Sequence, residues 1–309
     1  MEQLYARDVY GQTLVELGNK DKNLVVFDAD LSGSTRTVFF QREFPERFFN
    51  FGVAEQNMMA AAAGLASCGK IVFASTFAMF ATARALDQVR NSICINNFNV
   101  KIVATHGGIS VGEDGASHQA LEDINFFRAI PNMKIVVPAD GPQTREAVIA
   151  AYETQGPVYI RLGRSKVPTL ENKGKFTLGK GHILISGKGL AIISCGAMVQ
   201  KALAARQLLE KEGISPTVVN MHTIKPIDEE LLIDIAKSHS KIIVCEEHQV
   251  NGGLFSAVAE ILIRKQPIQT ECIGVQDLFG QSGSPKELMD FYGLSSNCIA
   301  EKAKSFMRQ

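Results

Sequence analysis

Residues 51–57 read FGVAEQN and lie where a predicted strand turns directly into an alanine-rich segment. The apolar spacing after Glu55 predicts a helix over 55–68, which puts the carboxyl group of Glu55 in the first turn. A carboxylate is stabilised there by the helix dipole and by free backbone N–H groups. Because the neighbouring residues are apolar, we expect Glu55 to be at least partly buried, and a buried carboxylate needs a partner.

The chain on both sides of this turn alternates between short apolar runs and amphipathic segments. Strands are predicted at 24–27, 70–74, 100–105, 134–137 and 158–162, and helices at 3–17, 55–68, 78–96 and 142–154. This alternation predicts a parallel sheet covered by helices on both faces. Ligands of such sheets bind at the carboxyl ends of the strands, so the polar loop at 30–36 is a candidate binding loop.

The composition changes near residue 165, where Lys, Gly and Pro interrupt the periodic pattern. We therefore predict an α/β protein of two domains, each a mostly parallel sheet covered by helices. The predicted parts are a first domain over 1–165, a linker over 166–188 with one short strand near Ile183, and a smaller domain over 189–309. In the smaller domain, strands are predicted at 190–194, 217–220 and 241–245, and helices at 198–212, at 228–237, after Gly253 and after a capping box of Ser284 and Glu287.

Composition excludes several classes of function. Of the 309 residues, 46% are hydrophobic and 21% charged, as in ordinary globular proteins, and 32 basic residues balance 32 acidic ones. Since the sequence has no basic arm or patch, nucleic acid and membranes are not expected partners. No apolar run approaches the length of a membrane span. The six cysteines are scattered without metal-ligand spacing, which predicts reduced thiols in a cytoplasmic protein.

Three further motifs follow FGVAEQN: STFAMF at 75–80, THGGIS at 105–110 and GEDGASHQ at 112–119. In this order and spacing the chain resembles the pyrimidine-binding domain of transketolase, a thiamine-diphosphate enzyme. The likeness covers nearly the whole chain, because IKPID at 224–228 and EEH at 246–248 resemble the C-terminal domain of transketolases. Several separated motifs are more specific than any one of them alone.

The resemblance implies that thiamine diphosphate is the cofactor and that Glu55 is catalytic. In thiamine enzymes a carboxyl group hydrogen-bonds the pyrimidine nitrogen, which lets the cofactor's own amino group act as a base. By resemblance, Phe77 and Phe80 hold the pyrimidine ring, and their spacing at a helix start puts both rings on one side. The resemblance also implies that Asp30 and Leu31 contact the cofactor near the subunit junction.

These residues also have plain structural interpretations. Glu55 fits an ordinary first-turn glutamate, and the two phenylalanines, Phe77 and Phe80, fit core residues that face the sheet. Asp30 fits a turn residue at a strand end. One position departs from the family pattern: transketolases often carry a third aromatic residue where this chain has Ala83. The pyrimidine pocket is therefore expected to be looser or to be completed from elsewhere.

Polar residues in the irregular segment 105–119 form the candidate substrate site. Two histidines, His106 and His118, flank its glycines with Asp114 between them, a cluster that an apolar core does not supply. By resemblance, His118 is a catalytic residue that bonds a sugar hydroxyl or the carbonyl-derived oxygen. Asp114 reads the hydroxyl configuration of the acceptor, and His106 helps to bind phosphate.

The remaining phosphate ligands implied by the resemblance are Arg7, Ser34 and Arg164. Arginine suits phosphate because its planar guanidinium forms paired, charge-assisted hydrogen bonds. The motif YIRLGR at 159–164 allows either Arg161 or Arg164 at this position, and we prefer Arg164. Arg7 also fits an ordinary arginine on a surface helix.

One motif of the family is missing. Thiamine enzymes of this kind bind the diphosphate and its Mg²⁺ through a Gly-Asp-Gly segment followed by an Asn pair, and this chain has no Gly-Asp-Gly. Its pair at 96–97 lies at a predicted helix end, where Asn commonly stops a helix. We therefore assign no metal ligand to this chain and infer a split transketolase, whose N-terminal subunit is the partner that binds Mg²⁺. Two copies of each chain are expected, because each cofactor needs groups from both.

The resemblance implies transfer of a two-carbon ketol unit from a ketose phosphate to an aldose phosphate, as in the pentose phosphate pathway. Three alternatives stay open. The β subunit of a 2-oxo acid dehydrogenase shares the fold and the pyrimidine-binding Glu, but GEDG at 112–115 with His118 is typical of sugar-phosphate enzymes. Deoxyxylulose-phosphate synthase has a similar loop but normally keeps both halves on one chain. A non-catalytic binding or regulatory paralogue is disfavoured by the retained residues Glu55, His106 and Asp114.

Overall fold

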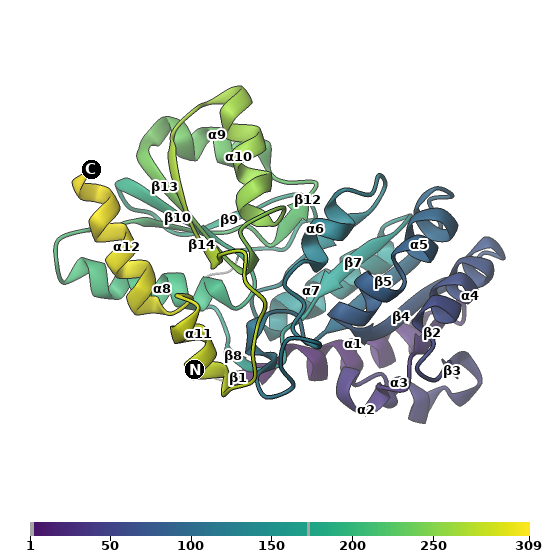
Figure 1. Ribbon diagram of the computed structural model, residues 1–309. Helices are drawn as coiled ribbons and strands as arrows, with labels where there is room; N and C mark the ends of the chain where they lie inside the picture. The colour runs from purple at the N-terminus through teal and green to yellow at the C-terminus, as the bar shows by residue number, and fades with distance from the viewer. Residues whose placement is uncertain (1–2, 172–173) are drawn as a thin grey trace.

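The computed structural model describes residues 3–171 and 174–309. Residues 1–2 and 172–173, which fall in the predicted first domain and linker, lie outside the described residues. Figure 1 shows two lobes, one built on a seven-stranded sheet and the other on a five-stranded sheet. The prediction of an α/β protein with two mostly parallel sheets covered by helices is confirmed. The domain boundaries at 165 and 189 stay predictions.

The seven-stranded sheet has the order β12-β6-β7-β5-β4-β2-β3. Its strands are β2 (Leu24–Asp28), β3 (Phe48–Asn50), β4 (Ile71–Phe77), β5 (Val100–Thr105), β6 (Lys134–Val136), β7 (Val158–Arg161) and β12 (Thr223–Lys225). The first six pair in parallel, and β12, from the second half of the chain, pairs antiparallel with β6. The carboxyl ends of β2, β4, β5 and β7 therefore meet at one edge of the sheet, where the predicted site residues follow.

Helices cover both faces of this sheet (Figure 1). One face carries α1 (Ala6–Lys20), α3 (Val38–Glu43) and α7 (Gly141–Glu153), whose buried side chains form one apolar cluster with the sheet. The other face carries α4 (Glu55–Ser67), the segment 80–94 and α6 (Asp123–Arg128). A short helix, α2 (Ser32–Thr35), lies in the loop after β2.

The segment 80–94 differs from the single α-helix that was predicted over 78–96. Two π-helical turns, Phe80–Arg84 and Val89–Cys94, flank the short helix α5 (Leu86–Gln88). A π-helical turn contains more residues than an α-helical turn and is frequent at functional sites. The apolar spacing predicted the extent of this helical segment but gave the wrong type of turn. The number of residues per turn in an α-helix and in a π-helix differs too little to be told apart over so short a run.

The predicted helix over 3–17 begins later, at Ala6. Residues Gln3–Tyr5 form β1, which pairs antiparallel with β8 (Lys166–Pro168) in a separate two-stranded sheet. Neither strand was predicted, because a three-residue strand is specified by its partner rather than by its own periodicity. The strand expected near Ile183 is present as β9 (His182–Ile185).

The five-stranded sheet has the order β14-β13-β10-β11-β9. Its remaining strands are β10 (Gly189–Ser194), β11 (Thr217–Asn220), β13 (His239–Gln249) and β14 (Gln269–Val275). One face packs against α8 (Met198–Glu210) and α12 (Ser296–Arg308), the other against α9 (Glu229–Ser238) and α10 (Leu254–Lys265) (Figure 1). The predicted capping box is confirmed at the start of α11 (Pro285–Phe291). Both β14 and α12 come in addition to the predicted elements.

The two lobes share one apolar core. A single cluster of buried side chains runs from Ile102 and Phe127 of the first lobe to Ile193 and Val244 of the second. This continuity lets groups of the second lobe hold loops of the first in fixed positions. In the part of the chain that the structure describes, no helix is long and apolar enough to cross a membrane.

The buried histidine His222 predicts a loss of stability in acid. Burial lowers the pKa of His222 to about 3, below its ordinary value of 6.5. Between these values the unfolded chain binds a proton that the folded chain does not, so the free energy of unfolding falls as the pH is lowered through this window. When the pH is lowered from 7 to 5, we expect the free energy of unfolding of His222→Gln to fall by about 2 kcal/mol less than that of the wild type. Urea unfolding at both pH values measures this, and equal losses in the two proteins would contradict it.

Candidate active site

Glu55 is the first residue of α4 and has only 3% of its surface exposed. The chain enters the helix from β3 through Gly52, whose φ of 67° suits glycine. Free N–H groups of the first turn and the helix dipole stabilise a carboxylate at this position. A buried carboxylate needs a partner, and here the partner is Arg84. Its Nη1 lies 3.1 Å from Oε1 of Glu55. Glu55 is thus buried, as the apolar sequence around it predicted.

Arg84 is a site residue that the sequence analysis missed. It ends the π-helical turn Phe80–Arg84, and its guanidinium carbon lies 4.0 Å from the centroid of the Phe80 ring. Arg84 lies four residues after Phe80, a spacing that places the two side chains on the same side of a helical turn. Ala83 itself is exposed. The pairing of Arg84 with Glu55 had no signal in the sequence, because it joins residues that are 29 positions apart in the chain.

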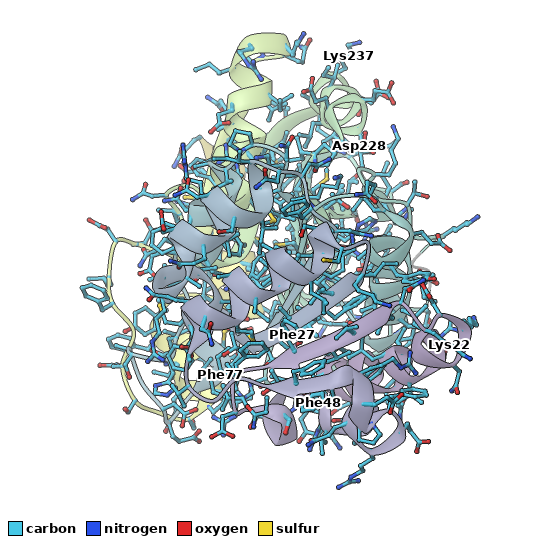
Figure 2. All side chains as sticks on the ribbon, turned by 90° about the vertical axis from the view of Figure 1, so that its right-hand side faces the viewer. Lys22, Phe27, Phe48, Phe77, Asp228 and Lys237 are labelled. Atoms are coloured by element: carbon cyan, nitrogen blue, oxygen red, sulfur yellow. The ribbon has the colours of Figure 1, made fainter. Side chains whose placement is uncertain are left out.

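The two predicted aromatic residues lie side by side. Phe77 is the last residue of β4 and Phe80 begins the π-helical turn, and both are buried. Their ring centroids are 5.8 Å apart with the planes inclined by 20°. Phe77 belongs to a strand rather than to a helix start, because β4 continues beyond its predicted end at residue 74. Figure 2 shows Phe77 in the lower, N-terminal half of the molecule, whereas Asp228 and Lys237 lie towards the top.

The two predicted histidines join this aromatic pair. His106 follows β5 directly, and its ring stacks on Phe77 with centroids 3.9 Å apart. The His118 ring meets Phe80 edge-on, with centroids 5.2 Å apart. Nδ1 of His106 also lies 2.8 Å from the hydroxyl oxygen of Thr105. The structure therefore brings four of the predicted residues into one aromatic cluster at the carboxyl edge of the sheet.

Positive charges gather beside this cluster. Burial, together with the nearby charges of Arg7 and Arg164, lowers the pKa of His106 to about 3, so its imidazole is neutral at pH 7. Burial and the charges of Arg36 and Arg164 lower the pKa of Arg7. Nη1 of Arg7 donates to the carbonyl oxygen of Ser34 at 3.4 Å, while its buried Nε has no hydrogen-bond partner among the described atoms. Like charges held together around an unsatisfied donor fit an anionic ligand.

The glycine-rich loop is also linked to Arg164. Nη1 of Arg164 donates to the carbonyl oxygen of Val111 and lies 3.2 Å from Oε2 of Glu113. The same nitrogen is 3.9 Å from Oδ2 of Asp114, whose side chain is 42% exposed. The structure thus places the predicted substrate residues Asp114 and Arg164 next to each other, with both open to solvent.

The alternative arginine, Arg161, has a different environment. It ends β7 with 6% of its surface exposed, and its Nε lies 2.7 Å from Oδ2 of the buried Asp123. Its Nη2 donates to the carbonyl oxygens of Ala120 and Glu247. Because these donors are used inside the protein, the geometry favours Arg164 as the residue available to a ligand.

The loop after β2 is held by Asp28, which the sequence analysis did not single out. Oδ1 of Asp28 accepts a hydrogen bond from the backbone N–H of Leu31 at 2.6 Å, and Oδ2 accepts one from the hydroxyl of Thr35 at 2.7 Å. Burial raises the pKa of Asp28 to about 6. Asp30 is exposed, has a φ of 63° and is bonded to Asn50. The predicted cofactor contacts Asp30 and Leu31 therefore lie on this loop and outside the aromatic cluster.

The second lobe fixes the glycine-rich loop. Oε1 of Glu247, at the end of β13, accepts a hydrogen bond from the backbone N–H of Ser110 at 2.7 Å. Gly108 has a φ of 97°, and a Cβ atom at that position would lie 2.3 Å from Oε1 of Glu247. The buried Gln119 donates to the carbonyl oxygen of Gln281, which ties the other end of the loop to the second lobe. The EEH motif at 246–248 thus has a positioning role that the sequence did not reveal.

These groups fit a flat, basic heterocycle. The guanidinium of Arg84 is itself planar, stacks on Phe80 and binds the buried carboxylate of Glu55. An aminopyrimidine offers the same combination of a flat face and hydrogen-bonding nitrogen atoms. Over residues 3–171 and 174–309, no group of three His, Cys, Asp or Glu side chains is arranged to hold a metal ion.

Comparison with known families agrees with this geometry. Residues 2–169 match the pyrimidine-binding domain of transketolase, and residues 179–299 match the transketolase C-terminal domain. The chain belongs to the transketolase family. The resemblance stated from the motifs is therefore confirmed, and it extends over both lobes.

Three similar proteins show how the family divides into chains. A protein of Methanocaldococcus jannaschii named for a transketolase C-terminal section is 50% identical, over 98% of this chain and 96% of its own. A solved structure described as a split gene transketolase in an inactive β4 tetramer is 49% identical with a TM-score of 0.92, over 99% of both chains. The 1-deoxy-D-xylulose-5-phosphate synthase of Dictyoglomus thermophilum is 38% identical over 97% of this chain but only 49% of its own.

The close approach of Gly108 to Glu247 predicts that a side chain cannot be accommodated there. We expect Gly108→Ala to lower the free energy of unfolding by about 2 kcal/mol, because of the positive φ and the clash with the carboxylate. The matched control is Gly64→Ala in α4, where a Cβ atom meets nothing within 4 Å. That change should leave the thermal midpoint unchanged or raise it. Equal midpoints for the two variants in a thermal unfolding experiment would contradict the proposed packing of the loop.

Proposed function

We propose that this transketolase-family chain is the C-terminal subunit of a two-chain transketolase. The enzyme moves a two-carbon ketol unit from a ketose phosphate to an aldose phosphate with thiamine diphosphate. The observation that carries the proposal is the buried carboxylate of Glu55, whose partner Arg84 also covers Phe80. A buried acid, an aromatic face and a cluster of basic residues at the same sheet edge suit a cofactor with a heterocycle and a phosphorylated substrate.

The proposed cofactor site takes residues from three segments: the start of α4, the end of β4 with the π-helical turn after it, and the loop after β2. When bound, thiamine diphosphate would supply the nucleophilic carbon that ketol transfer requires. Glu55 would hydrogen-bond the pyrimidine nitrogen of the cofactor and share a proton with it. Phe77 and Phe80 hold the ring by stacking. Asp30 and Leu31, on the loop fixed by Asp28, contact the cofactor near the subunit junction.

The substrate is bound by the aromatic cluster and the glycine-rich loop. His118, next to Phe80, bonds a sugar hydroxyl or the carbonyl-derived oxygen and is the second catalytic residue of this chain. Asp114 accepts a hydrogen bond from the acceptor's hydroxyl group, and its exposed carboxylate is free to do so. The contacts of Ser110 and Gln119 with the second lobe position the loop that carries both groups.

The phosphate group of the sugar binds at the basic cluster. Arg7, Ser34 and Arg164 supply its ligands together with His106, which is neutral and donates one N–H. The unsatisfied Nε of Arg7 is one donor that a phosphate oxygen would complete. Arg36, whose charge contributes to the shift of Arg7, is itself paired with Asp8, with its Nε 2.6 Å from Oδ1.

The partner is an N-terminal transketolase subunit that carries the Gly-Asp-Gly segment and binds Mg²⁺ with the diphosphate. Three observations support it: the absence of that segment here, the match to a C-terminal section along nearly its full length, and the inactive β4 tetramer of a split gene transketolase. We propose two copies of each chain in the active assembly. The cytoplasmic location and the pentose phosphate pathway stay predictions from the sequence.

A second candidate function is that of a 1-deoxy-D-xylulose-5-phosphate synthase, because one such enzyme is 38% identical to this chain. The two reactions differ in their donor. A synthase of that kind requires pyruvate, whereas a transketolase uses a ketose phosphate. Turnover that depends on pyruvate would favour the synthase, and pyruvate decarboxylation coupled to a dehydrogenase complex would favour the 2-oxo acid dehydrogenase subunit.

Reconstitution tests the proposed function. The chain mixed with its partner subunit, Mg²⁺ and thiamine diphosphate should transfer ketol units between sugar phosphates. In this assembly Glu55→Ala should lower kcat by about 100-fold or more, because the pyrimidine loses its proton partner. Size-exclusion chromatography should show the same assembly for the variant and the wild type. The control is Glu16→Ala, which removes an exposed ion pair with Arg145 and should leave kcat unchanged.

Two results would contradict the proposal. Turnover by this chain alone would exclude the split-subunit arrangement. A near-normal kcat for Glu55→Ala in the full assembly would remove Glu55 from the mechanism.

A further inference from the structure

Arg84 makes both of the contacts that the proposed cofactor needs. Its Nη1 lies 3.1 Å from Oε1 of Glu55, and its guanidinium carbon lies 4.0 Å from the centroid of the Phe80 ring. The proposed role of Glu55 is to hydrogen-bond a pyrimidine, and that of Phe80 is to stack on it. A planar group with N–H donors therefore already stands between the carboxylate and the aromatic face.

The exposed fractions of the two side chains show that Arg84 lies between solvent and the carboxylate of Glu55. The side chain of Glu55 is 4% exposed, whereas that of Arg84 is 47% exposed. An open cavity of about 580 Å³ is lined by both residues together with Gln56, Asn57 and Ala83. A molecule that enters this cavity from solvent meets the guanidinium before it meets the carboxylate.

Arg84 and a pyrimidine would occupy the same place, beside Oε1 of Glu55 and over the face of Phe80 that the guanidinium covers. The proposed mechanism needs Glu55 to share a proton with a ring nitrogen. A guanidinium keeps its protons at any physiological pH and has no acceptor atom, so it cannot take part in that exchange. An Arg84 that stayed on Glu55 would leave the carboxylate paired with the wrong group.

We propose that Arg84 is a placeholder for the cofactor. In the cofactor-free subunit it neutralises the buried carboxylate of Glu55 and covers the face of Phe80, and it leaves both when the pyrimidine binds. This inference rests on the proposed function, because it assigns the displaced position to the pyrimidine of thiamine diphosphate. The free energy needed to break the ion pair then lowers the measured affinity for the cofactor.

The backbone around Arg84 can stay in place during this exchange. Nε2 of Gln56, in the first turn of α4, donates to the carbonyl oxygen of Arg84 at 3.0 Å. This bond fixes the end of the π-helical turn to the helix that carries Glu55. The displacement therefore needs only rotation of the long, half-exposed side chain of Arg84 towards solvent.

The first part of the test uses the cofactor-free chain and needs no activity. Thermal unfolding is measured for the wild type, Arg84→Met, Glu55→Gln and the double variant, with Arg90→Met as the control. Arg90 lies on the same helical segment and is exposed, with a hydrogen bond to Asn91. We expect Arg84→Met to lower the midpoint in the wild type but much less in the Glu55→Gln background. Equal losses in both backgrounds would overturn the inference.

The second part measures affinity for the cofactor. Thiamine diphosphate with Mg²⁺ is titrated calorimetrically into this chain assembled with its partner subunit. Arg84→Met should bind about fivefold more tightly than the wild type, the effect of removing one half-exposed ion pair and one cation–π contact from the free state. Arg90→Met should match the wild type.

The outcomes separate the two proposals. Equal or weaker binding by Arg84→Met overturns the placeholder role and leaves the proposed function standing. If neither protein binds thiamine diphosphate, the proposed function fails and the placeholder role fails with it.

Discussion

A carboxylate that is removed from water must be matched by other charges or dipoles, and Glu55 imposes this requirement on the whole N-terminal lobe. The start of α4 supplies backbone N–H groups, and Arg84 supplies the opposite charge. Arg84 ends the π-helical turn that begins at Phe80, and its guanidinium lies over the Phe80 ring. The parallel sheet then brings the ends of β4 and β5 beside this pair, so that Phe77 and His106 stack at the same edge.

The C-terminal lobe holds the glycine-rich loop of the N-terminal lobe in place. Glu247 binds the backbone of the glycine-rich loop, and Arg161 joins that lobe to the buried Asp123. These buried, charge-assisted hydrogen bonds are strong and leave the loop little freedom. These bonds hold the loop at Ser110 and Gln119, on either side of Asp114 and His118.

The sequence predicted those features that depend only on the residues of one continuous segment. The alanine-rich helix after Glu55 predicted its burial, and the periodic runs predicted most strands and helices to within a few residues. The sequence did not predict contacts between segments that are far apart in the chain. The pairing of Gln3–Tyr5 with Lys166–Pro168, the bond from Glu247 to Ser110 and the ion pair of Arg84 all depend on the folded arrangement. The π-helical turn at Phe80–Arg84 escaped prediction because its period differs too little from that of an α-helix over one turn.

The central claim is that Glu55 binds the pyrimidine of thiamine diphosphate at a site shared with a second subunit. A crystal structure of this chain assembled with its partner, Mg²⁺ and thiamine diphosphate tests it most directly. The account predicts a pyrimidine nitrogen within hydrogen-bond distance of Glu55, the ring against Phe80, and the guanidinium of Arg84 moved away from both. A cofactor bound elsewhere, with the Glu55–Arg84 ion pair intact, would contradict it.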